Sequence, residues 1–180
     1  MSYILISAAV VVLFTFMARS IERNRKRERA AETARTAKSY VMNEHGLDDV
    51  FVSDEDGSLI GLSATRRILV LGGRDGNRVT PFDAIRSVEG LRDGIVLVSA
   101  ERGGTAAMPA GDRDSPPPQR VRTLTLRITF DGPEPTGHSV LFLDGGKHGL
   151  EPLNTHLHKQ AALTEAWYRQ VVEAMRSTAS

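Results

Sequence analysis

The chain has 180 residues, a net charge of +1 and no cysteine. The lack of thiols excludes cysteine nucleophiles, Cys-ligated zinc and lipoprotein attachment. Its charge is unevenly distributed, because residues 1–18 carry no charged side chain and eight Lys and Arg residues follow within 19–38. This junction is the most informative feature of the sequence, since it bears on where the protein lies in the cell.

The N-terminal apolar stretch predicts a membrane anchor over residues 1–18. As a helix, eighteen residues rise about 27 Å, close to the thickness of a thin hydrocarbon core of about 30 Å. The side chains expected in lipid are Tyr3, Ile4, Leu5, Val11, Leu13, Phe14 and Phe16. A secretory signal peptide is the main alternative, but no basic residue precedes Tyr3. A buried soluble helix is the other.

The basic neck, residues 19–46, predicts the orientation of the anchor. Residues 19–38 contain eight Lys and Arg against three Glu, a net charge of +5, which leaves −4 for residues 39–180. The positive-inside rule then places the N-terminus outside and the rest in the cytoplasm. The residues expected to lie against anionic lipid headgroups are Arg19, Arg23, Arg25, Lys26, Arg27 and Arg29. A nucleic-acid-binding arm is a weaker alternative, since no aromatic residue interleaves with these cations. We expect the neck to be a solvated helix to about Met42; the alternative is weak self-association through the face formed by Ala30, Ala34, Ala37 and Val41.

From Asp49 onward the pattern changes to short strands separated by turns, within a domain spanning 47–178. Five Asp-Gly pairs, typical of turns between antiparallel strands, occur at 56–57, 75–76, 93–94, 131–132 and 144–145. We expect seven strands, at Val50–Ser53, Ser58–Leu62, Arg67–Leu71, Arg78–Phe82 continuing through Ile85–Glu89, Ile95–Ala100, Val121–Phe130 and His138–Leu143. The clearest is Val121–Phe130, in which apolar and polar residues alternate strictly from Thr123 onward.

Two further segments complete the domain. Residues 101–119 lack periodicity and predict a long loop, in which Pro116–Pro118 reads as a stiff hinge rather than a polyproline ligand. Between Thr155 and Arg176 the period becomes helical, and Trp167 is expected to pack on an open end or face of the sheet. The apolar stripe consists of Leu157, Ala161, Trp167, Val171, Ala174 and Met175.

This layout, seven strands and then one amphipathic helix, resembles the pleckstrin-homology-like (PH-like) split barrel. The stretch from Phe51 to Leu62, then Arg67–Leu71 and Val79–Glu89, resembles bacterial PH-like domains of unknown function, many of them membrane-anchored. The resemblance covers roughly 48–176 and is most specific at Pro81–Glu89. It implies a mainly β α+β fold and an inner-membrane protein. A phosphoinositide site is disfavoured, because the first hairpin tip, Asp54–Asp56, carries three carboxylates.

The motifs that could carry chemistry read as structural. His156 and His158 stand where the terminal helix begins, two residues apart, and are better interpreted as a solvated helix start than as a metal site. Asp54–Ser58 resembles a calcium loop, but the first and twelfth positions would be Val52 and Ser63. Residues 72–76, Gly-Gly-Arg-Asp-Gly, favour a hairpin turn over a phosphate loop. We therefore expect no catalytic, cofactor-binding or metal-binding residue and no cofactor.

The sequence favours a single-pass bacterial inner-membrane protein that presents a PH-like module to a protein partner through a sheet edge, the groove beside the terminal helix or loop 101–119. The alternative is a structural subunit of a membrane assembly such as a secretion or conjugation machine. An enzyme is a third, weaker hypothesis. Neither the partner nor the oligomeric state is predicted.

Overall fold

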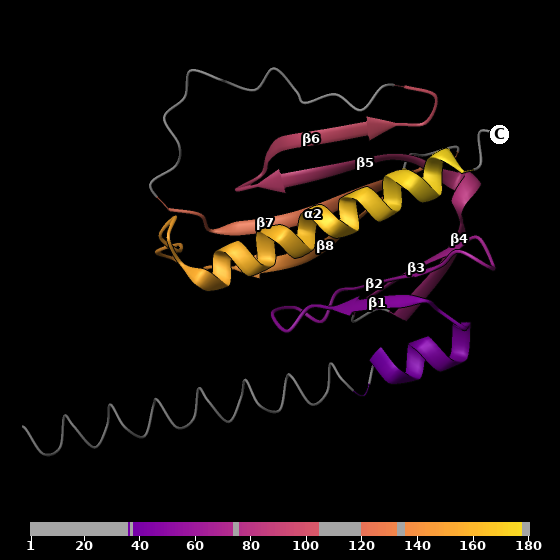
Figure 1. Ribbon diagram of the computed structural model, residues 1–180, viewed down its shortest axis with the longest axis horizontal. Helices are drawn as coiled ribbons and strands as arrows, with labels where there is room; N and C mark the ends of the chain where they lie inside the picture. Colours follow the sequence, from indigo (N-terminus) through magenta and orange to yellow (C-terminus); the bar gives the residue numbers. More distant parts are fainter. Residues whose placement is uncertain (1–35, 37, 74–75, 105–119, 133–135, 178–180) are drawn as a thin grey trace, which may run out of the picture.

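The computed structural model describes residues 36, 38–73, 76–104, 120–132 and 136–177 (Figure 1). These residues form a mainly β α+β domain with eight antiparallel strands in two four-stranded sheets and a C-terminal helix. The elements in chain order are β1 (Asp49–Val52), β2 (Leu59–Ser63), β3 (Ile68–Gly73), β4 (Gly76–Pro81), the 3-10 helix η1 (Phe82–Ala84), β5 (Ile85–Arg92), β6 (Ile95–Glu101), β7 (Thr123–Phe130), β8 (Thr136–Asp144) and α2 (Thr155–Arg176).

The first sheet is a meander of consecutive hairpins, in the order β1-β2-β3-β4. An Asp-Gly pair lies in the β1–β2 turn, where Gly57 has a φ of +76°. The β2–β3 turn has no glycine, and Arg67 takes the left-handed conformation there with a φ of +56°. Three consecutive core residues of β3, Leu69 to Leu71, are buried, so this strand is covered on both faces.

The second sheet has the order β6-β5-β7-β8 and is therefore not a simple meander. β6 and β7 both pair antiparallel with β5, one on each side, so they run parallel to each other. The β5–β6 turn is formed by Asp93 and Gly94, which both have positive φ, as an Asp-Gly type I′ turn requires. Most of the connection from β6 to β7, residues 105–119, lies outside the described residues.

The strand expected to run from Arg78 through Glu89 is two strands, which gives eight strands instead of seven. Pro81 ends β4, and η1 turns the chain from the first sheet into the second. Proline has no N–H to donate, so it ends a strand readily. Phe82, which follows, donates its backbone N–H to the carbonyl of Arg67 and is buried. By contrast, the alternation in β7 is confirmed, with all four apolar residues from Leu124 to Phe130 buried.

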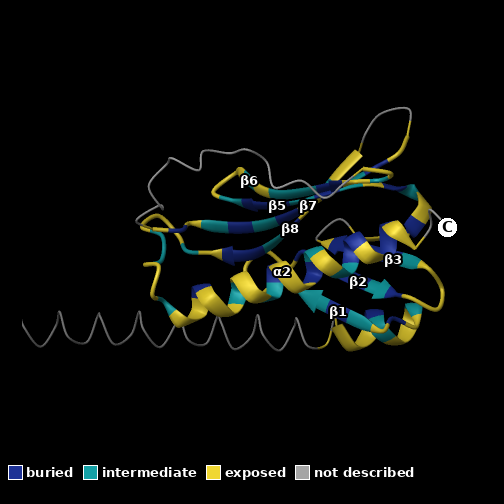
Figure 2. Ribbon diagram, turned by 45° about the horizontal axis from the view of Figure 1, so that its top comes forward, coloured by how far each residue is buried: buried dark blue, intermediate teal, exposed yellow. Residues whose placement is uncertain are grey.

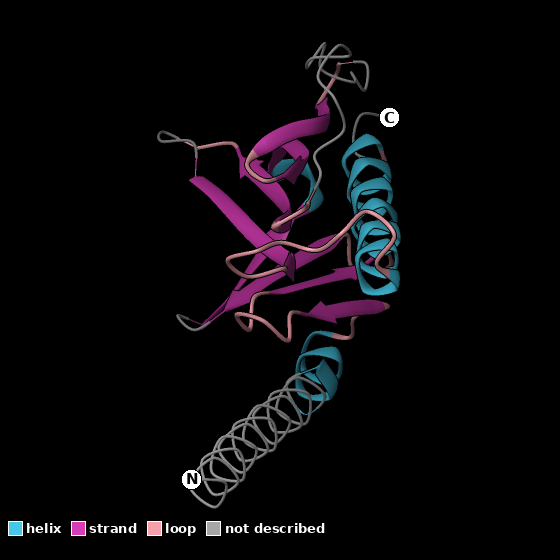
Figure 3. Cartoon of the chain, turned by 90° about the vertical axis from the view of Figure 1, so that its left-hand side faces the viewer, coloured by secondary structure: helices cyan, strands magenta, loops and turns pink. Residues whose placement is uncertain are grey.

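The strands cross one another at an angle beside the C-terminal helix (Figure 3). The two sheets meet along β8, which contacts strands of the first sheet at two points. At its start, Thr136 accepts a hydrogen bond from Arg78 of β4, 3.2 Å away. Near its other end, Phe142 stacks on Phe51 of β1 with ring centroids 4.2 Å apart. The main core fills the space between the sheets and α2 and includes Ile60, Leu71, Val88, Leu126, Phe130, Val140, Leu143 and Trp167.

Helix α2 has the predicted bounds and packs its apolar face on β5, β7 and β8 (Figure 2). The predicted role of Trp167 is confirmed, since this residue is only 2% exposed and belongs to the main core. The stripe differs in three residues, because Ala161 is exposed while Thr164 and Val172 are buried. Thr164 also bonds back to the carbonyl of Gln160. The Asn154 side chain caps the helix by accepting from two backbone N–H groups.

A short helix over residues 38–45 covers the outer face of the first sheet. It continues to His45, beyond the expected end at Met42, and Val41 is not solvated but 3% exposed. Val41 belongs to a second cluster with Leu47, Val50, Leu59 and Val70, whose side chains lie on the opposite face of the sheet from Ile60, Leu69 and Leu71. The end of the neck is therefore part of the folded domain.

The helix ends in a Schellman motif. Gly46 has a φ of +58°, and the N–H of Leu47 bonds to the carbonyl of Met42 at 3.1 Å. Gly61 of β2 makes room for this junction, because a Cβ there would lie 2.5 Å from Cδ1 of Leu47. The tight end fixes the direction in which residues 38–45 approach the sheet.

Within the described ranges, no helix is long and apolar enough to cross a bilayer. The predicted anchor, from Tyr3 to Phe16, lies outside the described residues. The basic residues from Arg19 to Arg29 lie outside them as well.

Candidate binding groove beside the terminal helix

An open groove of about 410 Å³ lies between the last turns of α2, η1 and the β2–β3 turn. Its apolar part is formed by Leu62, Phe82 and Ala174, of which Phe82 and Ala174 are buried. Its rim includes the exposed residues Thr65, Arg67 and Glu173. The groove thus combines an apolar centre with one cation and one anion at its edge, a lining typical of sites that bind a protein segment or a small ligand.

Each wall of the groove follows from a local feature of the sequence. The amphipathic period of α2 turns Ala174 toward the sheet and leaves Glu173 exposed. Pro81 ends β4, and the 3-10 turn that follows directs Phe82 into the molecule. The four-residue turn between Ser63 and Ile68 closes the third side.

Arg67 is the residue that joins two of these walls. Its Nη2 donates to the carbonyl oxygen of Ser177, just past the end of α2, at 2.9 Å. Its own carbonyl accepts the N–H of Phe82 at 3.0 Å. A guanidinium at a helix C-terminus also interacts favourably with the helix dipole. A non-glycine residue with positive φ stores strain, so these two bonds help to hold a strained conformation at the groove.

Gln170 links α2 to the first strand below the groove. Its Nε2 donates to Oδ2 of Asp49 at 3.4 Å, whereas its Oε1 is buried without a hydrogen-bond partner. A buried unpaired acceptor destabilises the fold. The helix is thus held to β1 by a long polar contact at this point, which is weaker than the apolar packing around Trp167.

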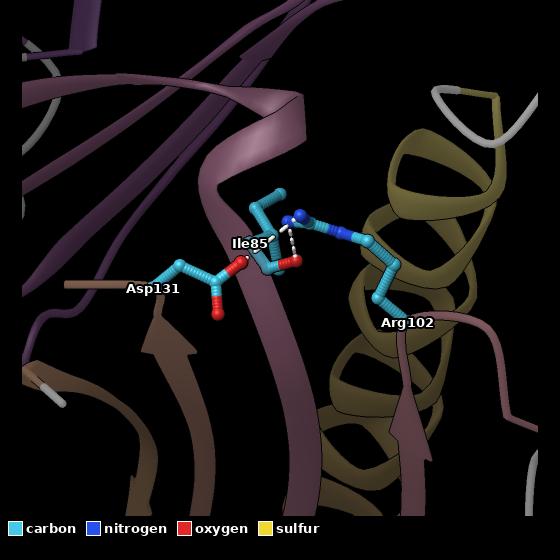
Figure 4. A network of polar contacts seen from close by, with 3 residues as sticks. All are labelled: Ile85, Arg102 and Asp131. Atoms are coloured by element: carbon cyan, nitrogen blue, oxygen red, sulfur yellow. Dashed lines mark hydrogen bonds and ion pairs between the residues drawn. The ribbon is translucent and has the colours of Figure 1, made fainter.

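A second polar network involves Arg102, at the start of the predicted loop 101–119 (Figure 4). Arg102, just after β6, donates to the carbonyl of Ile85 and pairs with Asp131 at 3.0 Å. The N–H of Asp131 in turn bonds to the carbonyl of Ala84. This network ties the ends of β6 and β7 to the start of β5. Residues 105–119, the rest of the predicted loop, lie outside the described residues.

The exposed edge of the second sheet is β6, which carries apolar side chains. Ile95 is 65% exposed and Leu97 is 37% exposed. Edge strands present unpaired backbone groups and can pair with an added strand. β6 is therefore a second surface of the kind expected from the sequence.

The other residues singled out in the sequence lie apart from the groove. His156 and His158 are exposed in the first turn of α2, which confirms a solvated helix start. Asp54–Asp56 forms the exposed β1–β2 turn, as predicted, and Gly72 and Gly73 end β3 at its hairpin. In the part of the chain with described side chains, no three His, Asp or Glu residues gather as a metal site would require.

Two groups in this part of the molecule have displaced pKa values. Burial lowers the pKa of His138 in β8, and nearby Arg78 lowers it further, while the carbonyl of Gly72 and the charge of Asp56 act in the opposite direction. Its Nε2 is buried without a partner. Burial also raises the pKa of Tyr168 on α2. Neither residue lines the groove, so both displacements are properties of the packing rather than of the candidate site.

Comparison with protein-family models, curated proteins and solved structures finds no match to this chain. The groove therefore has to be interpreted from its own geometry. The sequence suggested a groove beside the terminal helix, but not Phe82 or Arg67 as its walls. The available signal was the Arg66-Arg67 pair in a turn with no glycine.

Proposed function

We propose that this protein is a membrane-tethered binding module that holds a segment of a protein partner in the groove between α2, η1 and the β2–β3 turn. The observation that carries the proposal is the groove itself, with its apolar centre and its two rim charges, Arg67 and Glu173. A segment with one apolar side chain flanked by charged residues has the chemistry to fill it.

The fold assigned to the module is a PH-like split barrel. The four-stranded meander, the second sheet meeting it along β8 and the helix beside both support this assignment. The β6-β5-β7-β8 order is a departure from a barrel made only of consecutive hairpins. Such barrels bind peptides through backbone and shape, a mode that needs no reactive side chain.

The tether is proposed from the sequence. The eighteen uncharged residues at the N-terminus and the +5 neck that follows favour a single span with the β-domain in the cytoplasm of a bacterium. The burial of Val41 adds a consequence for such a tether, because the neck enters the domain through a docked helix rather than through a free linker. The module would then be presented in a restricted orientation.

The groove is tested by photo-cross-linking in cells. A photoreactive amino acid replaces Thr65 at the rim, in the full chain, and a second version carries it at Lys159, exposed at the opposite end of α2. We expect a discrete adduct from position 65 and none from position 159. The adduct should weaken when Glu173→Arg makes both rim charges positive.

Two outcomes would count against the groove. One is the same set of adducts from both positions, which would indicate random collision. The other is an adduct from position 65 that Glu173→Arg leaves unchanged, since the rim charge would then have no part in recognition.

A further inference from the structure

The β2–β3 turn, residues 64–67, contacts both helices that flank the first sheet. Its last two residues, Arg66 and Arg67, are adjacent in sequence but donate to different helices. Arg66 donates through Nη1 to the carbonyl of His45, at the end of the helix over residues 38–45, at 2.9 Å. Arg67 donates through Nη2 to the carbonyl of Ser177, at the end of α2, also at 2.9 Å. One short turn therefore supplies a cationic cap to two helix C-termini.

Further bonds tie the same turn to the residues around it. Oδ2 of Asp48, just after the helix over residues 38–45 (the neck helix), accepts the N–H of Ala64 at 2.6 Å. On the groove side, the carbonyl of Arg67 accepts the N–H of Phe82. The guanidinium of Arg66 also packs over Gly46, where an added Cβ would lie 3.2 Å from Cζ. The turn is thus attached to the neck on one side and to the groove on the other.

The turn is also short and conformationally restricted. It joins the paired residues Ser63 and Ile68 through four residues without glycine, one of them at a positive φ. Because the turn has little conformational freedom, a displacement of Arg67 is expected to move Arg66 as well. Ala64, Thr65 and Arg67 line the groove, so an occupant would touch the element that caps the neck helix.

We infer that the β2–β3 turn couples the docking of the last turn of α2 beside the groove to the docking of the neck helix on the outer face of the first sheet. Loosening either cap loosens the other, because the two arginines share one backbone. In the membrane-tethered module proposed above, such coupling gives groove occupancy a route to the segment that leads to the anchor. The coupling itself is a property of the folded domain and does not depend on the identity of a partner.

Hydrogen–deuterium exchange of the full chain in detergent tests this inference. The principal variant is Arg67→Asn, because asparagine adopts positive φ readily but cannot reach Ser177. We expect the amide exchange rates to rise about two- to fivefold at residues 170–177 and also at residues 38–47. A rise of this size corresponds to the loss of one exposed hydrogen bond from a charged group. Arg66→Ala should raise exchange in the same two segments, because coupling is reciprocal.

The matched control is Arg86→Ala, which removes an exposed arginine of β5 outside the turn and should leave both segments unchanged. Arg67→Gly is a second variant that also tolerates positive φ, in case Arg67→Asn folds poorly. The inference is overturned if each variant affects only the helix that its own arginine caps. Because the measurement uses no partner, its result stays separate from that of the cross-linking experiment.

Discussion

At the scale of single residues, the junction of the neck helix and the first sheet depends on Gly46. We expect Gly46→Ala to lower the free energy of unfolding by more than the about 1–2 kcal/mol that a left-handed alanine costs. The reason is that the new Cβ would meet the Arg66 guanidinium at 3.2 Å and displace it from His45. Urea unfolding monitored by Trp167 fluorescence measures the loss.

Gly57 provides the matched control for this substitution. It also has a positive φ, +76°, but a Cβ there would meet no atom within 4 Å. Gly57→Ala therefore measures the backbone strain alone. Equal losses for the two variants would show that the contact with Arg66 contributes nothing to stability.

His138 should make stability depend on pH. Burial lowers its pKa in the folded protein from the ordinary value of 6.5, and Arg78 adds to this effect. Below about 6.5 the unfolded chain takes up a proton more readily than the folded one, so the free energy of unfolding falls. The fall ends once the pH is below the lowered pKa, where both states are protonated.

The measurement compares urea unfolding of the wild type with that of His138→Gln between pH 8 and pH 4. We expect the difference in unfolding free energy between the two proteins to change in the acid range, with the wild type losing more stability on acidification. A constant difference across this range would contradict the role given to His138.

At the scale of elements, Trp167 is the largest buried side chain of α2. We expect Trp167→Ala to cost about 3–5 kcal/mol, the usual loss for removing a large buried aromatic side chain. Trp167→Phe keeps most of the apolar contact and should cost less. Thermal unfolding followed by circular dichroism distinguishes the two variants. A loss below about 1 kcal/mol for Trp167→Ala would mean that the helix is held mainly by other contacts.

Elements with a strong local period could be predicted from the sequence. The alternation in β7 and the helical stripe of α2 are each dictated by burial of one face, so both were expected near their observed positions. The break at Phe82–Ala84 was missed because the apolar pattern continues across it. The pairing of β7 with β5 was not predictable either, since strand order is set by long-range contacts.

The groove was predictable only as a general location. Its walls come from three segments, the turn near residue 65, η1 and the end of α2, that no local pattern brings together. The burial of Val41 escaped prediction for a similar reason. An alanine-rich helix looks solvated from its sequence, and only the second apolar face of the first sheet explains why its last turns dock.

At the scale of the whole molecule, the first sheet is covered on both faces. The second sheet and α2 cover one face, and the neck helix covers the other. This arrangement bears on whether the apolar N-terminus is a simple tether. We expect replacement of residues 2–18 by an unrelated apolar helix to leave the cross-link from position 65 intact. Loss of the adduct with unchanged membrane recovery would favour the alternative, a subunit whose span packs against other helices.

The central claim is that the N-terminus lies on the outer side of the membrane while the groove lies on the cytoplasmic side. Because the chain has no cysteine, one engineered thiol reports one position, and Ser2→Cys and Thr65→Cys can be labelled with a membrane-impermeant maleimide. The account predicts labelling of position 2 in intact cells and of position 65 only after permeabilisation, with both proteins recovered in the membrane fraction. Labelling of position 65 in intact cells, or recovery of the full chain in the soluble fraction, would contradict it.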